Sequence, residues 1–402
     1  MKEDLLPNLM HIRAFAHVAE TGSISRASDS LFRAQSVVTR CIGEFEAHLG
    51  HALFERHPRG VRLTEPGRCI LPRAQRILGE LKNVARLLGF EPRTEPIFLY
   101  QKKRLQIFVC LCRTLSMRAA ANHFQVTQPA ISAALKALEA GCRVNLFERT
   151  TAGLQATQAS QEILYPINRA LNELQHLRTD LHALRGNVEG AVRVGALPLA
   201  RTNILPEAIV QLTHRHPGIQ VITNESPFEF LANELRAGDI DFIFGALRPA
   251  YSTADIQGLE LFSEEMVLVA RGGHPLLEVP PCPGDLASAR WILPRANSPA
   301  RTLINAWFAE AGIDDPDVVV ESGDLATIRG LLRSSDMLAA VSAHQLEYEI
   351  ASGEIRRLPV RLARTARPIG LMERTGCLHS PATLALLRSI REQIAASLPA
   401  PA

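Results

Sequence analysis

The sequence lacks the features that mark exported, membrane-spanning and metal-binding chains. Its 7 cysteines are an odd number without paired metal-ligand spacing, which indicates reduced thiols and no metal site. The chain does not open on a charged start followed by an apolar run, and it has no stretch long and apolar enough to cross a bilayer. We therefore expect a cytoplasmic protein that is neither exported nor inserted in a membrane.

The motifs of common enzymes are missing as well. The sequence has no Gly-x-Ser-x-Gly elbow, no P-loop and no cluster of metal ligands, and its histidines and Ser298 show no triad order. We expect no catalytic residues, no cofactor and no enzymatic activity.

Charge is divided unevenly along the chain. The 402 residues, 47% of them hydrophobic, are enough for about three domains. Residues 1–188 hold 25 Lys and Arg against 16 Asp and Glu, a net charge of +9, whereas residues 189–402 have a net charge of −6. All five lysines also lie in the first part. A basic part beside an acidic part favours a polyanionic partner for the basic one.

The basic part is organised around a stretch that occurs twice. Thr21–Arg56 aligns with Thr114–Arg149 without a gap, at a constant offset of 93 positions. A period of this length indicates a duplicated domain rather than a solenoid. Identical pairs include Thr21/Thr114, Ser23/Ser116, Ala27/Ala120, Gln35/Gln128, Glu46/Glu139 and the Phe-Glu-Arg triplets at 54–56 and 147–149.

Each copy has the pattern of a winged helix-turn-helix. In the first, apolar residues at helical spacing predict helices over 11–20, 25–31 and 35–49. Two short helices, the second starting with polar and cationic residues, are typical of a helix-turn-helix, and residues 57–64 predict a hairpin wing for the DNA backbone. The residues expected to contact DNA are Arg33, Gln35, Ser36, Thr39, Arg40, Arg59 and Arg62.

The second copy keeps this layout with fewer cations. Arg40 corresponds to Ala133, and the wing arginines at 59 and 62 correspond to Ala152 and Gln155. We expect the first copy to make most of the phosphate contacts. The second copy would extend the length of DNA that is contacted and read some of the bases. Its candidate DNA-binding residues are Thr127, Gln128, Pro129, Ser132 and Lys136.

A long amphipathic helix is predicted after each copy, over 68–89 and 161–184. An apolar stripe on a helix outside a compact domain usually packs on a partner helix. Between the first of these helices and the second copy, Pro92 and Pro96 without a helical period predict an irregular linker.

From residue 188 strands and helices alternate, which predicts parallel α/β sheets in two subdomains with a cleft. The predicted fold is an α+β multidomain chain, with two winged helix-turn-helix domains, each with a long linker helix, and then a two-subdomain α/β domain with a cleft. The predicted boundaries are 9–67 (first winged domain), 68–90 (its linker helix), 91–101 (linker), 102–160 (second winged domain), 161–186 (its linker helix) and 188–396, with subdomain I about 188–270 and 364–396 and subdomain II about 271–363.

The repeated motifs resemble the LysR-type transcriptional regulators. Gln-Pro-Ala-Ile-Ser at 128–132, followed by Leu-Phe-Glu-Arg at 146–149, looks like the family's DNA-binding signature. Residues 35–40 match it too, with Gly-Val-Arg-Leu-Thr-Glu-Pro-Gly at 60–67 as a better-kept wing.

The C-terminal part is also similar to this family, so the resemblance covers essentially the whole chain. Residues 245–249, 329–337 and 367–371 look most like the branch that includes the galactose-binding-protein regulators. The resemblance implies that the two-subdomain α/β part is an effector domain like a periplasmic binding protein. It further implies a regulator that senses a small-molecule effector in the cleft of this domain and controls transcription of a catabolic operon. The implied partners are double-stranded promoter or operator DNA and a small-molecule effector, for which an anion is one candidate. The chain is also expected to form a homodimer or homotetramer, and to contact RNA polymerase if it is an activator.

The effector residues are expected where strand ends and loops converge on the cleft. Arg248 would pair with a carboxylate there or form a surface ion pair, and Ser298 could equally be only a helix cap. The candidates are Thr202, Ser226, Arg248, Ser298 and Ser342.

The sequence departs from the family by carrying two winged units and two linker helices. In the family these helices pair between chains, so a dimer of this chain would hold four winged units. We expect a dimer as the minimal functional unit, bound to tandem half-sites. Gly141-Cys142-Arg143 stands where Leu-Gly is usual, which leaves open a second winged domain that serves as a spacer or dimerisation module. A periplasmic-type solute binder, suggested by the C-terminal half alone, is disfavoured by the helix-turn-helix units and the missing signal peptide.

Overall fold

The computed structural model describes residues 6–58, 60–91, 94–151, 153–248, 254–296 and 298–397. The chain folds into two compact bodies. The N-terminal body runs through Gly190 and includes Arg236–Asp239, and the C-terminal body comprises Ala191–Leu235 and the chain from Ile240 onward. Among the described residues, no helix is long and apolar enough to cross a membrane.

The first winged unit consists of three helices and a two-stranded hairpin. Asn8 and Ser23 cap its first two helices with their side chains, while Gly22 and Gly50, both with positive φ, end the first and third. The three predicted helices are confirmed to within two residues. Its elements are α1 (Leu9–Thr21), α2 (Ile24–Leu31), α3 (Gln35–Leu49), β1 (Phe54–His57) and β2 (Gly60–Leu63).

The second winged unit repeats these elements. Ser116 caps its second helix as Ser23 does in the first copy. Leu115 and Arg143 adopt the left-handed conformation at the positions of Gly22 and Gly50. Its elements are α5 (Lys102–Thr114), α6 (Met117–Phe124), α7 (Gln128–Cys142), β3 (Phe147–Thr150) and β4 (Gly153–Ala156).

One glutamate in each copy fixes the start of the wing. Glu46 Oε1 accepts hydrogen bonds from the backbone N–H groups of Leu53 and Phe54, at 2.7 and 3.2 Å. Glu139 accepts the equivalent bonds from Leu146 and Phe147, at 2.9 and 3.3 Å. The identity of these two glutamates therefore reflects a structural role.

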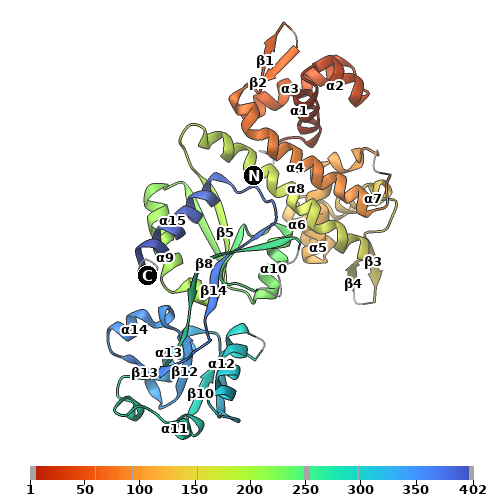
Figure 1. The fold of residues 1–402 in the computed structure, drawn as a ribbon. Coiled ribbons are helices and arrows are strands. Elements are labelled where there is room, and N and C mark those ends of the chain that lie inside the picture. Colours follow the sequence, from red (N-terminus) through yellow and green to blue (C-terminus); the bar gives the residue numbers. More distant parts are fainter. Residues whose placement is uncertain are drawn as a thin grey trace. The chain divides into compact units, whose positions relative to one another are not determined.

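The two long helices are α4 (Glu65–Leu87) and α8 (Gln158–Ala183), and each begins three residues before its predicted start. Thr64 and Thr157 cap them by accepting hydrogen bonds from Gly67 and Ser160. The prediction that each apolar stripe needs a partner helix is confirmed, because α4 packs against α8 of the same chain (Figure 1). A second chain is therefore not required to cover either stripe, which differs from our expectation that these helices pair between chains.

The connection between α4 and α5 is more ordered than predicted. It contains a 3₁₀ turn, η2 (Ile97–Tyr100), in which Leu99 and Tyr100 are buried. Both residues join one continuous apolar core that extends from α1 through both winged units to α8. The proline spacing indicated irregular backbone but gave no signal for this burial.

The C-terminal body contains two five-stranded sheets. Their strand orders are β6-β5-β7-β14-β8 and β11-β10-β12-β9-β13. The first sheet has α9 and α15 together on one side and α10 on the other (Figure 1). The strands are β5 (Gly190–Ala196), β6 (Ile219–Asn224), β7 (Phe242–Ala246), β8 (Ile256–Glu264), β9 (Met266–Arg271), β10 (Arg290–Leu293), β11 (Asp317–Glu321), β12 (Leu338–Ser342), β13 (Ile355–Arg361) and β14 (Arg367–Arg374).

The helices of this body cover the two sheets. The sequence predicts helices over 204–215, 229–237, 300–311, 325–333 and 381–396, and α9, α10, α12, α13 and α15 confirm them to within two residues. The helical elements are η3 (Pro198–Arg201), α9 (Ile204–Arg215), α10 (Phe228–Ala237), η5 (Pro275–Leu277), α11 (Pro283–Ala287), α12 (Pro299–Glu310), α13 (Leu325–Ser334), η6 (Ala343–Leu346), α14 (Glu347–Ala351) and α15 (Pro381–Ser397).

Two expectations for this body are wrong. The sheets are mixed rather than parallel, since β14 runs antiparallel to both β7 and β8, and β9 runs antiparallel to both β12 and β13. The predicted subdomain boundary near residue 270 also assigned β9 to the first sheet, whereas β9 pairs within the second. Strand β8, largely exposed, was not predicted because it lacks a clear alternation of buried and exposed residues.

Candidate DNA-binding surface and effector site

The recognition helix of the first unit presents a polar face. Val38, Ile42, Phe45 and Leu49 are buried on its inner side. All five candidate contacts on and before this helix are exposed, and they are Arg33, Gln35, Ser36, Thr39 and Arg40. Helical spacing predicted this division, because apolar and polar residues of α3 fall on opposite faces.

Arg40 is the main cation of this face. Its side chain is 71% exposed, and Nε lies 3.8 Å from Glu44 Oε1 one turn later on the same helix. An exposed i,i+4 pair of this length contributes little to stability. The Arg40 guanidinium can therefore leave Glu44 for a phosphate or a guanine edge at small cost.

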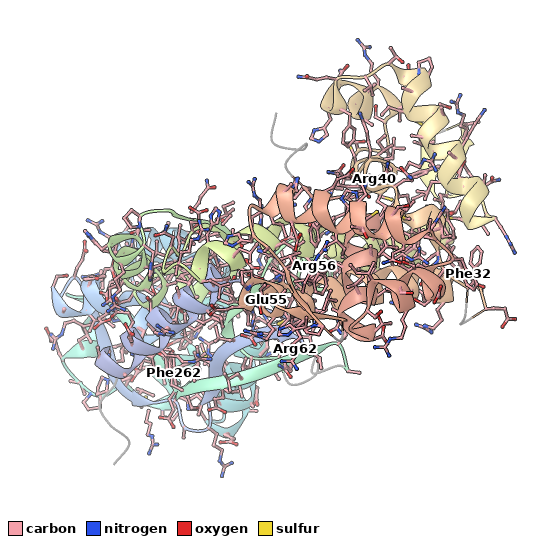
Figure 2. The ribbon with its side chains drawn as sticks, turned by 90° about the horizontal axis from the view of Figure 1, so that it is seen from above. Phe32, Arg40, Glu55, Arg56, Arg62 and Phe262 are labelled. Atoms are coloured by element: carbon pink, nitrogen blue, oxygen red, sulfur yellow. The ribbon has the colours of Figure 1, made fainter. Side chains whose placement is uncertain are left out.

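The wing of the first unit adds exposed cations. Arg56 lies on β1 and Arg62 on β2, and both are exposed (Figure 2). The predicted contact Arg59 falls outside the described residues. Gly60 holds the hairpin against α1, because an added Cβ would meet Gly22 O at 2.3 Å. Arg56 was not among the predicted contacts, although its place in the repeated Phe-Glu-Arg triplet was a usable signal.

Phe32 is a second residue that the sequence reasoning missed. It ends α2 in the left-handed conformation, at φ 51°, and its side chain is 93% exposed directly before the recognition helix. In the view of Figure 2 it lies on the opposite side of the winged unit from Arg62. The equivalent position in the second unit is Gln125, which has the same conformation. A large apolar side chain at a turn position that favours glycine or asparagine was the available signal.

The recognition helix of the second unit has fewer polar groups to offer. Thr127, Gln128, Pro129 and Lys136 are exposed, but Ser132 is only half-exposed. Ala133, at the position of Arg40, is exposed and carries no hydrogen-bonding group. The two recognition helices therefore differ in their exposed side chains, as predicted: α3 presents Arg40 where α7 presents Ala133.

The five effector candidates do not share one environment. Ser226 Oγ donates to Asn224 Oδ1 at 2.8 Å within its own turn. Ser298 Oγ accepts from Arg301 N at 3.2 Å and begins α12, so the helix cap considered as its alternative role is confirmed. These bonds give Ser226 and Ser298 local structural roles.

Thr202 and Ser342 are linked through two further residues, Glu264 and His344. Ser342 Oγ donates to Glu264 Oε1 at 2.5 Å, and His344 Nδ1 lies 2.7 Å from the same oxygen. Thr202 Oγ1 donates to His344 O at 3.3 Å. Because Glu264 ends β8 while Ser342 ends β12, this cluster joins the two sheets of the C-terminal body.

The charges of this cluster stabilise one another. Burial alone would raise the pKa of Glu264, but the hydrogen bonds from His344 and Ser342 outweigh it and lower the pKa. The hydrogen bond with Glu264 in turn raises the pKa of His344 above its ordinary 6.5. Each residue of the pair therefore favours the charged form of the other.

Arg248 and Arg367 provide positive charge beside Glu264. Arg367 pairs in register with Glu264 across β14 and β8. Burial lowers the pKa of Arg367. The negative charge of Glu264 opposes this shift, and the positive charge of Arg248 adds to it. The Arg248 guanidinium lies 5.1 Å from the centre of the Phe228 ring. The buried atoms Arg367 Nε and Glu264 Oε2 have no hydrogen-bond partner among the described residues.

Glu373, Cys377 and His379 form a possible metal-binding group among the described residues. His379 Nε2 lies 3.2 Å from Glu373 Oε1 and 3.5 Å from Cys377 Sγ. Burial opposes the positive charge of His379, but the hydrogen bonds with Cys377 and Glu373 together raise its pKa to about 10. In this arrangement His379 and Glu373 form an ion pair.

Family comparisons match the chain in three places. The model described as "Bacterial regulatory helix-turn-helix protein, lysR family" matches residues 9–68 and again 103–161. The model described as "LysR substrate binding domain" matches residues 185–395. The chain belongs to the LysR family of transcriptional regulators. It therefore carries DNA-binding and effector-binding domains and is a regulator rather than an enzyme.

Curated relatives differ in how much of this regulator they match. The HTH-type transcriptional regulator GalR of Pseudomonas putida is 59% identical over 389 residues, which is 97% of this chain and 98% of that protein. PcaQ of Agrobacterium fabrum is 28% identical over 297 residues, 72% of this chain and 94% of its own. GalR therefore aligns across both winged units, whereas PcaQ leaves about a quarter of this regulator unmatched.

Solved structures support the fold of this LysR-family regulator. A full-length OxyR variant of Pseudomonas aeruginosa matches with a TM-score of 0.55 at 23% identity, covering 73% of this chain and 94% of its own. CbnR, a LysR family transcriptional regulator, matches with a TM-score of 0.52 at 22% identity, covering 73% and 99%.

Proposed function

We propose that the first winged unit is the principal DNA reader of this regulator, acting on chromosomal DNA in the cytoplasm. Gln35, Ser36, Thr39 and Arg40 contact base edges in the major groove, while Arg62 and the missed Arg56 hold the backbone. The observation that supports this most is the fully exposed polar face of α3, opposite a fully buried apolar face.

Phe32 extends this reading surface. Phe32 is 93% exposed and precedes α3 by three residues, so it can contact the DNA that α3 reads. Apolar contact with a thymine methyl or a sugar is a use that its place before α3 allows.

The second winged unit is a weaker reader in this proposal. Exposed Gln128 and Lys136 suit an adenine edge and a phosphate, respectively. Its wing offers Arg149 on β3 and Gln155 on β4, both exposed. The alternative, a spacer without DNA contact, predicts that these side chains can be removed without consequence.

A footprint separates these two roles. Full-length protein is bound to an operator selected from random duplex DNA, and Lys136→Ala is compared with wild type. A weakened half of the footprint supports a second reader, whereas an unchanged footprint and affinity support the spacer. Glu162→Ala, an exposed change on α8 in the same body, serves as the control.

The effector of this proposal is a small molecule bearing a carboxylate, bound near Arg248 and Arg367. The cations and the unpaired Arg367 Nε provide donors, while Glu264 Oε2 can accept from a hydroxyl or amine of the ligand. Thr202, Ser342 and His344 fix Glu264 rather than contacting the ligand directly. We propose control of a catabolic operon, in which the effector is a metabolite of the regulated route.

A thermal-shift panel of carboxylic acids tests this assignment. A ligand present at 100 times its Kd stabilises the folded state by about 2.7 kcal/mol, which is a measurable shift in Tm. We expect Arg248→Gln to abolish the shift while Arg215→Gln, an exposed residue at the end of α9, leaves it unchanged. A shift of equal size in both variants would place the effector elsewhere.

A further inference from the structure

The contacts between α4 and α8 define an antiparallel register. Arg76 Nε of α4 lies 3.2 Å from Glu173 of α8, and Glu80, one turn later on α4, binds Arg169, one turn earlier on α8. Arg169 makes two bonds with this carboxylate, at 2.7 and 2.8 Å.

These two ion pairs occupy equivalent positions in the two copies of the repeat. At the repeat offset of 93 positions, Arg76 is equivalent to Arg169, and Glu80 is equivalent to Glu173. Arg76 of the first copy contacts Glu173 of the second, and their equivalents Arg169 and Glu80 make the same contact in the reverse direction. Such reciprocal contacts define a two-fold interface. The midpoint of the register falls at Leu78 and Leu171, themselves equivalent and both buried. The two winged units are therefore related by an internal pseudo-two-fold axis.

One contact breaks this symmetry. Arg73, 3% exposed, donates from Nε and Nη2 to Asp180 at 2.6 and 3.0 Å, and from Nη1 to Glu173 at 2.5 Å. The equivalent of Arg73 is Pro166, and the equivalent of Asp180 is Leu87.

The broken symmetry specifies which helices pair. In an α8–α8 pair with this register, Asp180 would face Pro166, which carries no positive charge, and Glu173 would keep only an arginine at the position of Arg76, namely Arg169. In an α4–α4 pair, Arg73 would face Leu87 in place of Asp180. Burying either charge of this ion pair without its partner is costly, so α4 selects α8 over a second α4, and α8 selects α4 over a second α8.

The connecting segment binds both winged units. Glu95 Oε2 lies 2.9 Å from Arg13 Nε of α1 and accepts from Tyr100 Oη at 3.1 Å. On the other side, Phe98 covers Gly141 of α7, where an added Cβ would meet Phe98 Cβ at 2.6 Å. The departure from the family pattern at Gly141 therefore makes room for the connection.

We infer that one chain is a complete pair of DNA readers, built for duplex DNA with two inverted and unequal half-sites. The pseudo-two-fold axis places the readers in opposite orientations, which matches inverted rather than tandem half-sites. The half-sites differ because Arg40 of α3 is replaced by Ala133 of α7. This inference rests on the proposed DNA-reading role of both units, and it replaces our expectation that two chains must meet to form such a pair.

Charge exchange between Glu80 and Arg169 tests whether the pairing is within one chain. Full-length Glu80→Arg and Arg169→Glu variants are made singly, together in one chain, and as a co-expressed mixture of the two single variants. We expect each single variant to lower Tm and to lose protection of one half-site, and the double variant to recover most of both. The mixture is expected to behave like the single variants, because no chain in it holds a matched pair.

A mixture that recovers as fully as the double variant would overturn the inference, since α4 of one chain would then pair with α8 of another. Exchange of Arg301 and Glu321, an ion pair of the C-terminal body at 2.7 Å, is the control and should leave half-site protection unchanged. The Tm pattern does not involve DNA. If it appears as expected while no variant or wild type protects DNA, the pairing stands and the proposed DNA-reading role fails.

Operators selected from random duplexes by the wild-type chain provide a second test that requires no variant to fold. We expect two dissimilar half-sites in inverted orientation. Half-sites repeated in the same orientation, or a single half-site, would contradict the pseudo-two-fold arrangement.

Discussion

Arg73 of α4 donates two hydrogen bonds to Asp180 of α8, which lies 107 positions later in the same chain. The same guanidinium also binds Glu173, so one buried cation serves two carboxylates. This contact fixes which two helices of a duplicated sequence pack together.

Replacing Arg73 should be strongly destabilising. Arg73→Met would leave Glu173 and Asp180 without their shared cation, which costs about 3–5 kcal/mol in the free energy of unfolding. Denaturant unfolding of the full-length protein, followed by a signal from the N-terminal body, measures the change. Arg178→Met, on the same helix pair but without a contact to Arg73, should change stability by less than about 0.5 kcal/mol. Equal losses in the two variants would contradict the role given to Arg73.

Replacing Arg40 or Arg62 with alanine should weaken DNA binding in different ways. Arg40→Ala is expected to lose about 1–3 kcal/mol of binding to the selected operator and little binding to random DNA, because a bidentate contact reads the base. Arg62→Ala is expected to weaken both about equally and to reduce the salt slope by about one, because a phosphate contact carries no sequence information. Titrations at several salt concentrations distinguish them, and identical behaviour of the two variants would contradict the division of roles.

Phe32→Gln is a substitution already present in the second copy, where Gln125 adopts the same left-handed conformation. We expect no loss of stability, since the ring is exposed, and weaker operator binding because an apolar contact is lost. Operator affinity and Tm are measured together. Unchanged affinity would remove Phe32 from the reading surface, and a fall in Tm would show that it has a structural role.

Two glycines in helices provide a matched test of the connecting segment. Gly79 of α4 has open space around it, so Gly79→Ala should stabilise the protein by about 0.5–1 kcal/mol. Gly141→Ala gains the same helix propensity but places its Cβ against Phe98, and we expect a net loss. Equal stabilisation by both substitutions would show that Phe98 does not pack on α7.

The Glu264–His344 pair predicts a pH-dependent stability. The raised pKa of His344 gives stability that is complete below pH 6.5 and is lost as the pH rises through the folded-state value. The lowered pKa of Glu264 gives stability that is present above pH 4.5 and is lost as the pH falls through its folded-state value. The contribution is therefore greatest between these limits. His344→Gln should cost about 1–3 kcal/mol near pH 5.5 and much less at pH 9, measured by denaturant unfolding. The exposed substitution His214→Gln should cost the same small amount at both values.

The sequence predicted the winged units well because their helices have clear periodicity and caps. The outward placement of Gln35, Thr39 and Arg40 followed directly from the inward placement of Val38 and Ile42. The pairing of α4 with α8 could not be read in the same way, because an apolar stripe shows that a partner exists without identifying it. The identity of the partner depends on Arg73 and Asp180, which meet only once the antiparallel register is known.

The effector cluster was less predictable for a related reason. Ser298 was a candidate because it lies in a loop expected to face the cleft, but its hydroxyl caps α12. Glu264 gave no signal, since it ends a strand with no clear alternation, and its role depends on Ser342 and His344 from the other sheet. Contacts between distant strands are fixed by topology, which periodicity does not specify.

The central claim is that one chain supplies both readers of an inverted site. A short duplex carrying a single inverted pair of half-sites is titrated with full-length protein at concentrations far above Kd, and the saturation point is measured. The account predicts saturation at one chain per duplex, whatever oligomer the chains form through other surfaces. Saturation at two chains per duplex would mean that each chain contributes a single reader, and it would contradict the account.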